Sequence, residues 1–140
     1  MKTKPGSTLA SRPRPDSNRP LEAPLLSFDL HSLTERIKKE DDWKTGNHNA
    51  ITLVKNAGMR IVLIAMHKGN KIKMHFSEGE VCVHILEGQL EFNNGKKSMV
   101  LGKAQILALH EDIKYELVAV RATTFLLTMT NVKSNEERIF

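Results

Sequence analysis

Two histidines nine residues apart, His75 and His84, are the residues of this sequence best suited to chemistry. They stand on either side of the polar loop Ser77-Glu78-Gly79-Glu80, and each lies in a stretch with the composition of a β-strand. Imidazole is the commonest neutral nitrogen ligand for zinc, copper, nickel and iron. A strand, a loop and a returning strand could turn both rings into one cavity. The spacing therefore raises the hypothesis of a metal ion held between two strands.

The strand around His84 is apolar on both of its faces. Cys82 and Leu86 alternate along it with Val83 and Ile85, and alternate residues of a strand share a face. This pattern predicts that His84 is buried. A buried neutral histidine needs partners for both ring nitrogens, and these can be a backbone carbonyl, another side chain or a metal. The sequence leaves the three alternatives open.

Short runs rich in Val, Ile, Leu and Thr, separated by glycines, follow one another from residue 50 onward. Regular short strands with turn signals are typical of a β-sandwich or a small barrel, and the lack of a long helical period argues against a parallel sheet. We expect a type I′ hairpin at Asn94-Gly95. The expected strands are Ile51–Lys55, Arg60–His67, Lys71–His75, Val81–Leu86, Gln89–Asn93, Lys97–Leu101, Gln105–Leu109, Tyr115–Arg121 and Thr124–Asn131.

One helix is expected, over Phe28–Glu40. Ser32 and Glu35 have the spacing of a capping box, in which each side chain bonds the other residue's backbone N–H. Trp43 follows the helix, and we expect it to close one end of the domain as a packing residue.

Residues 1–24 hold all five prolines and carry a net +3 of the total net charge of +5. This composition predicts a disordered basic tail, followed by one domain over 25–140 with its core at about 50–130. The remainder is close to neutral and has one Trp and one Tyr, which argues against a nucleic-acid partner. The lone Cys82, with no signal peptide and no membrane span in the sequence, favours a cytoplasmic location.

The spacing of Gly69, His75, Glu80 and Gly88 resembles the first motif of the cupin superfamily, which runs glycine, five residues, His, any residue, His, three or four residues, Glu, six residues, glycine. Gly102 fits the start of the second motif. The stretches 50–56, 60–66, 83–88 and 125–128 look like one subgroup of small single-domain cupins. The resemblance implies an all-β double-stranded β-helix, or jelly-roll barrel, preceded by a short helix and the basic tail.

The resemblance implies only part of a metal site. His75 stands at the first metal-histidine position, whereas Ser77 stands at the second, Val81 at the glutamate position and Tyr115 at the last histidine position. His84 could replace a missing ligand. The candidate metal ligands are therefore His75, His84 and Tyr115, for a divalent transition metal (zinc, iron, nickel, manganese or copper) or for no metal at all. Candidates for the pocket or its rim are His110, Glu80, Ser77 and Met66.

Three functions remain open from the sequence. The first is a small-molecule-binding cupin-like protein, with or without a metal in the barrel. The second is a metal-dependent enzyme, similar to a dioxygenase or isomerase, acting on a small polar substrate. The third is a metal-free sensory or interaction module. No catalytic residue can be assigned, the ligand is unknown, and the resemblance implies a homodimer.

Overall fold

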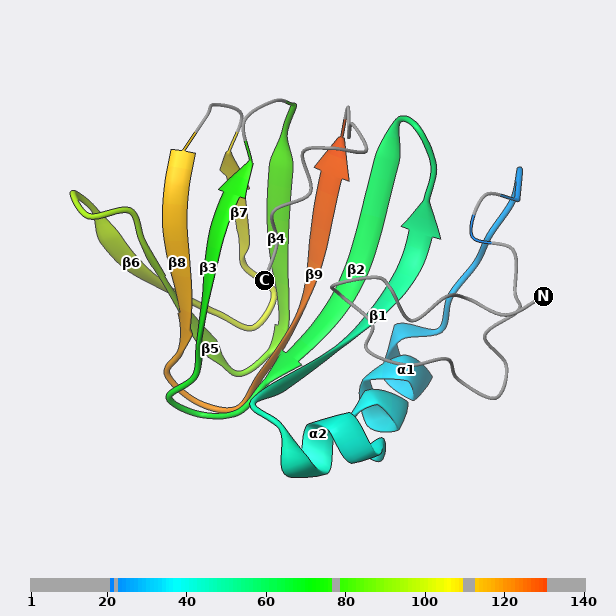
Figure 1. Ribbon diagram of the computed structural model, residues 1–140, viewed down its shortest axis with the longest axis horizontal. Helices are drawn as coiled ribbons and strands as arrows, with labels where there is room; N and C mark the ends of the chain where they lie inside the picture. The colour runs from blue at the N-terminus through cyan, green and yellow to red at the C-terminus, as the bar shows by residue number, and fades with distance from the viewer. Residues whose placement is uncertain (1–20, 22, 77–78, 110–112, 131–140) are drawn as a thin grey trace.

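The computed structural model describes residues 21, 23–76, 79–109 and 113–130. Two short helices precede nine strands (Figure 1). The expected basic tail lies almost entirely outside the described residues. All nine expected strands are present, with ends that differ by a few residues. The elements are α1 (Leu30–Ile37), α2 (Asp41–Thr45), β1 (His48–Lys55), β2 (Met59–Met66), β3 (Lys71–Phe76), β4 (Val81–Glu87), β5 (Gln89–Asn93), β6 (Ser98–Gly102), β7 (Ile106–Leu109), β8 (Ile113–Ala119) and β9 (Thr123–Thr130).

The strands form two antiparallel sheets, with the orders β1-β2-β9-β4-β7 and β3-β8-β5-β6. The pairs β5–β6, β4–β7, β3–β8 and β2–β9 are nested one inside the next, as in a long hairpin folded over on itself. This nesting is the jelly-roll arrangement. The predicted all-β jelly roll is therefore confirmed, although the two sheets are not closed into a continuous barrel.

The main core lies between the two sheets. Alternate residues of each strand point into it, so that Val83 and Ile85 of β4 meet Leu117 of β8 and Leu90 of β5, all of them fully buried. The interior is therefore filled by apolar side chains over most of its length.

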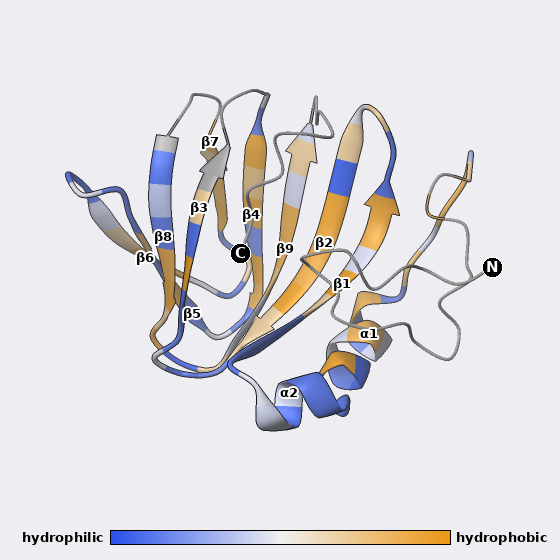
Figure 2. Ribbon diagram, in the orientation of Figure 1, coloured by the Kyte–Doolittle hydropathy of each residue, from blue (hydrophilic) through white to orange (hydrophobic). Residues whose placement is uncertain are grey.

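A second apolar cluster covers the outer face of the five-stranded sheet. Ile37 of α1 is fully buried there and packs with Ile51, Leu53 and Leu63 of β1 and β2. Trp43 of α2 packs against the same cluster, as expected for a residue that closes one end of the domain. Figure 2 shows β1, β2 and β9 as mostly hydrophobic and α2 as mostly hydrophilic. Neither helix among the described residues has the length and apolar character needed to cross a membrane.

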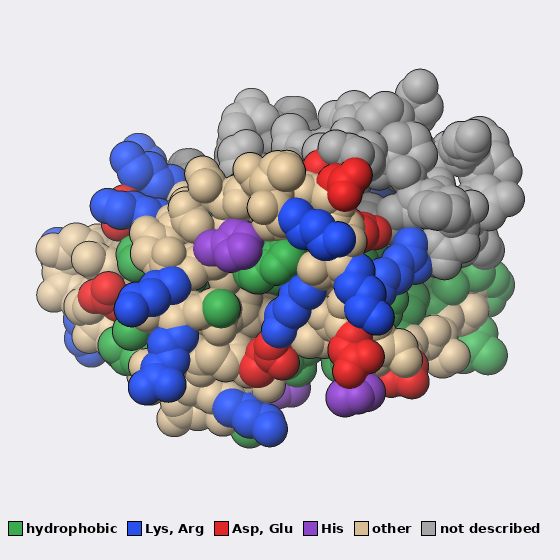
Figure 3. All heavy atoms as spheres, turned by 90° about the horizontal axis from the view of Figure 1, so that it is seen from below, with side chains coloured by type: hydrophobic (Ala, Val, Ile, Leu, Met, Phe, Trp, Pro, Cys, Tyr) green, Lys and Arg blue, Asp and Glu red, His purple; other side chains and the backbone are tan. Residues whose placement is uncertain are grey.

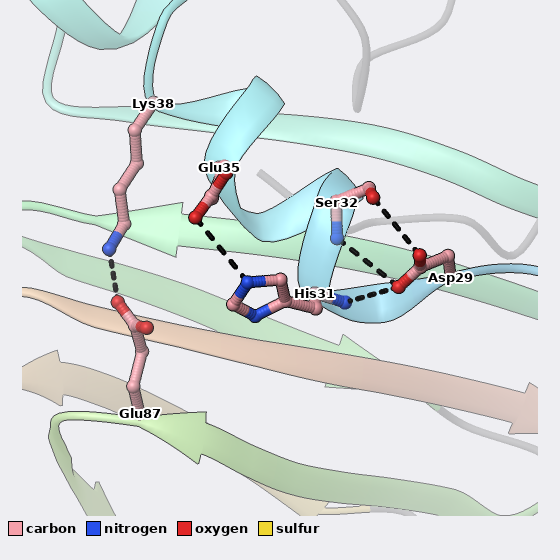
Figure 4. A network of polar contacts seen from close by, with 6 residues as sticks. All are labelled: Asp29, His31, Ser32, Glu35, Lys38 and Glu87. Atoms are coloured by element: carbon pink, nitrogen blue, oxygen red, sulfur yellow. Dashed lines mark hydrogen bonds and ion pairs between the residues drawn. The ribbon is translucent and has the colours of Figure 1, made fainter.

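Asp29, and not Ser32, caps the first helix. The Asp29 carboxylate accepts hydrogen bonds from the backbone N–H groups of His31 and Ser32 and from the Ser32 hydroxyl (Figure 4). The capping-box prediction is therefore wrong, because the chain becomes helical three residues earlier. At the other end of the helix, Lys38 forms an ion pair with Glu87, which ties the helix to the end of β4.

The turn after β5 also differs from its prediction. A type I′ turn needs positive φ at both Asn94 and Gly95, but only Gly95 has one, at +90°. The Asn94 side chain instead accepts hydrogen bonds from the backbone N–H groups of Lys96 and Lys97. This side-chain turn carries the hairpin over four residues in place of two.

Candidate ligand-binding site

Tyr115 is a polar residue within the apolar core. It lies on the inner face of β8, is 5% exposed and pairs across the sheet with Met74 of β3. Its ring also lies near that of Phe92, with ring centroids 5.4 Å apart. The Tyr115 hydroxyl has no hydrogen-bond partner among the described residues. Burial raises the pKa of this hydroxyl above its ordinary value, so it is a neutral donor at physiological pH.

A hollow of about 490 Å³ lies beside Tyr115. Its position follows from the pairing of β5 with β8, which ends at Asn93 and Glu116. Beyond that pair the β5–β6 turn leaves β8, so no described strand pairs with the first residues of β8 on this side of the sheet. The lining residues are Lys73, Met74, Asn93, Asn94, Gly95, Lys114, Tyr115 and Glu116.

The lining combines residues from both faces of the four-stranded sheet. Met74 and Tyr115 belong to the core side, whereas Lys73, Lys114 and Glu116 alternate with them and lie on the outer side. Lys73 is directly opposite Glu116 in the β3–β8 pair. The hollow therefore offers an apolar wall, the Tyr115 side chain and three charged side chains.

The structure places His84 away from Tyr115. Its neighbours along β4, Val83 and Ile85, point into the core between the sheets, so His84 lies on the opposite, outer face. There it is directly opposite Leu126, which packs against the outer apolar cluster, and Ile106, which is exposed. His84 is half-buried. We expected His84 to share an interior cavity with the other candidates, and this expectation is not met. The residues of β4 on the same face as His84 point toward the helices, not into the space between the sheets.

The remaining candidates are scattered. His75 is in β3, where its backbone pairs with Lys114, while Ser77 and His110 lie outside the described residues. Glu80 is exposed just before β4, and its backbone N–H donates to the Thr130 hydroxyl. Met66 is fully buried in the core at the far end of β2 and does not line the hollow. Of the candidates whose side chains the structure describes, only Tyr115 lines the hollow.

Sequence reasoning missed the other lining residues. Nothing in the sequence singles out Lys73 or Lys114. The alternation of Lys71, Ile72, Lys73 and Met74 does predict a strand with one charged face and one apolar face. This alternation does not indicate that the charged face of β3 borders a hollow. The presence of the hollow depends on where β5 ends.

A smaller hollow of about 160 Å³ lies on the outer face of the five-stranded sheet. Cys82 of β4 lines it and is only partly buried. The hydroxyls of Thr128 and Thr130 stand beside it on β9. His84 is not among its lining residues.

A scan against protein-family models and a search of curated protein sequences give no match. Solved structures do match. A conserved protein of unknown function from Streptococcus pyogenes is 26% identical, with a TM-score of 0.57 over 68% of this chain and 80% of that one. An RmlC-like cupin from Shewanella frigidimarina is 17% identical, with a TM-score of 0.58 over 64% of this chain and 81% of that one.

The chain has the cupin fold. Salicylate 1,2-dioxygenase from Pseudoaminobacter salicylatoxidans gives a TM-score of 0.65 over 84% of this chain, at 13% identity. The match spans only 38% of the dioxygenase. At this identity the likeness concerns the fold alone, and many unrelated chemistries share one fold.

The cupin fold implies a metal site between the sheets, and the described residues do not fit one. Val81 and Tyr115, at the positions where the motifs have glutamate and the last histidine, are both 5% exposed in the apolar core. Burial raises the pKa of Tyr115, which disfavours the phenolate that a metal would need. Among the described residues no group of three or more His, Cys, Asp or Glu side chains is placed to hold an ion.

Proposed function

We propose that this protein binds a small, largely apolar molecule in the hollow beside Tyr115. The volume of about 490 Å³ falls in the range of small-molecule sites, roughly 300–1,000 Å³. Such sites combine an apolar wall with a few polar groups that fix the orientation of the ligand. Met74 supplies part of the apolar wall here, and Tyr115 and Asn93 are lining residues with polar side chains.

The observation that carries this proposal is the buried hydroxyl of Tyr115. A buried polar group without a partner costs roughly 1–3 kcal/mol of stability. A phenylalanine in its place would avoid that cost. The hydroxyl therefore does not serve the stability of the fold, and we infer that it serves the binding of a ligand. The hydroxyl is closed to solvent, so we propose that a ligand displaces part of what covers it and accepts the hydrogen bond that the described residues do not.

The same residues favour binding over metal-dependent catalysis. The apolar side chains at Val81 and around Tyr115 occupy positions where a cupin metal site needs ligands. We therefore propose a binding protein whose ligand is recognised by shape, apolar contact and hydrogen bonds. An enzyme acting on a small polar substrate would need a ligand set that these residues do not supply.

A fragment screen followed by NMR tests the proposal. Wild type, Tyr115→Phe and the control Cys82→Ser, which alters the other hollow, are compared with the same compounds. We expect hits that shift the amide signals of Met74, Asn94 and Glu116, and that lose at least about threefold in affinity in Tyr115→Phe, since one neutral hydrogen bond contributes about 1 kcal/mol. Hits that bind Tyr115→Phe as tightly as wild type, or that shift only other regions, would contradict it.

A further inference from the structure

Two cations stand at the hollow that the proposed ligand would enter. Lys73 of β3 and Lys114 of β8 line it, and both are exposed. Since Lys73 is opposite Glu116, and Lys114 is two residues from Glu116 on the same strand, the two lysines are diagonal neighbours on one face of the sheet. Such diagonal positions lie roughly 7–8 Å apart, within reach of two flexible ammonium groups converging on one anion.

Glu116 is the one acidic residue among the described lining residues. It is half-buried and directly opposite Lys73, so it offsets part of the positive charge. The lining keeps a net charge of +1. On the end of the molecule seen in Figure 3, Lys and Arg side chains likewise lie beside Asp and Glu side chains.

We infer that the hollow is selective for small organic carboxylates. The carboxylate lies between the Lys73 and Lys114 ammonium groups, and the apolar body lies against Met74 and the Tyr115 side chain. The inference rests on the proposed function and adds the chemical class of the ligand. A carboxylate with an apolar body fits better than inorganic phosphate, because phosphate would leave the apolar part of the lining without a partner.

The test uses probes that differ in charge and little in shape. Phenylacetate and its neutral amide, phenylacetamide, are titrated into the full-length protein, with inorganic phosphate as a simple anion, and binding is followed by NMR at low salt and again with added sodium chloride. We expect phenylacetate to bind more tightly than phenylacetamide, and the difference to shrink with salt, as it does for exposed charges.

Charge variants identify the groups responsible. Lys73→Gln and Lys114→Gln should each weaken phenylacetate about two- to fivefold and leave phenylacetamide unchanged, the range expected for exposed ion pairs. Glu116→Gln should strengthen phenylacetate. Lys71→Gln is the matched control, because Lys71 is exposed on the same face of β3 but does not line the hollow.

The outcomes separate this inference from the proposed function. If phenylacetate and phenylacetamide bind equally and both shift the amide signals of the lining residues, the binding site stands and the anion preference is overturned. An equal loss of phenylacetate in Lys71→Gln, or binding of phosphate as tight as that of phenylacetate, would also overturn it. If neither organic probe shifts any signal of the lining residues, both proposals are contradicted.

Discussion

Trp43 and His67 stack on each other, with ring centroids 3.5 Å apart and an angle of 16° between the ring planes. The Nε2 atom of His67 also lies 2.7 Å from the Trp43 backbone oxygen. A carbonyl oxygen only accepts hydrogen bonds, so Nε2 carries the proton and donates it. The pair joins α2 to the residue that follows β2, and the two residues are 24 positions apart in the sequence.

Removing the imidazole should loosen α2 and change the environment of the only tryptophan. His67→Ala loses both the stack and the hydrogen bond, and we expect it to lower stability by about 1–2 kcal/mol. His67→Phe keeps a ring and loses only the hydrogen bond, so its stability should lie between those of His67→Ala and wild type. Urea unfolding followed by Trp43 fluorescence measures both effects. Equal stability of His67→Ala and wild type would show that the contact is incidental.

The sequence predicted the strands well because their signals are local. Glycines with positive φ at the turns, such as Gly69 and Gly88, separate runs whose alternation fixes which residues point inward. The predicted capping box was wrong, because Asp29 already accepts the Ser32 N–H that Glu35 would bind, and Asp29 lies at the point where the chain first turns. Two capping residues so close together cannot be ranked without the tertiary contacts that set the start of the helix.

The site could be predicted only in part. Tyr115 was found through its position in the resemblance, but its role as a ligand was inferred from a motif and not from its surroundings. His84 was expected inside because its strand is apolar on both faces. The second apolar face is explained by α1 and the segment before it, which cover the outer side of the sheet at Leu86 and Leu126. Which face a helix covers is a property of the whole fold.

Replacing Tyr115 by phenylalanine should separate stability from binding. Because the hydroxyl is buried and has no partner among the described residues, Tyr115→Phe should leave the free energy of unfolding unchanged or raise it by up to about 1 kcal/mol. Thermal unfolding at pH 7 measures this. A clear loss of stability would mean that the hydroxyl is already bonded within the protein, and would remove the main support for a ligand site.

The same residue predicts a loss of stability at alkaline pH. Burial raises the folded-state pKa of Tyr115 above 10, so the unfolded chain releases this proton at a lower pH than the folded chain does. The stabilisation is present below pH 10 and is lost as the pH rises beyond it. Tyr115→Phe should therefore show a shallower fall in stability than wild type between about pH 9 and 11.

Gly88 should tolerate no side chain. Its φ is +96°, and a Cβ atom would lie 2.3 Å from the Ala122 backbone oxygen and 2.6 Å from the Thr123 Cα atom. Gly88→Ala should cost more than about 3 kcal/mol, because strain and a backbone clash add together. Gly69→Ala is the control, since its φ is +87° but nothing lies within 4 Å of the added atom. It should cost only about 1–2 kcal/mol. Equal losses in urea unfolding would show that the β4–β5 turn can move aside.

We propose that a second copy of the chain covers the edge formed by β6 and β7, each the last strand of its sheet. Met99, Val100 and Ile106 are 42%, 54% and 58% exposed there. An apolar edge can pair with its own copy across a twofold axis. Ile106→Lys should then shift the sedimentation equilibrium from dimer to monomer, whereas Val120→Lys, at an exposed apolar position elsewhere, should not. A monomeric wild type would contradict the proposal.

Metal analysis closes the question that the two histidines first raised. Wild type, His75→Ala, His84→Ala and Tyr115→Phe are equilibrated with Zn²⁺, dialysed and analysed for bound metal. Since His84 lies on the outer face and Tyr115 is a neutral phenol in the core, we expect neither substitution to change the metal content. If His84→Ala alone lowered the metal content, the His84 imidazole would bind the metal on the outer face of the sheet. If His84→Ala and Tyr115→Phe both lowered it, β4 would have to turn over, which its pairing with β7 and β9 opposes.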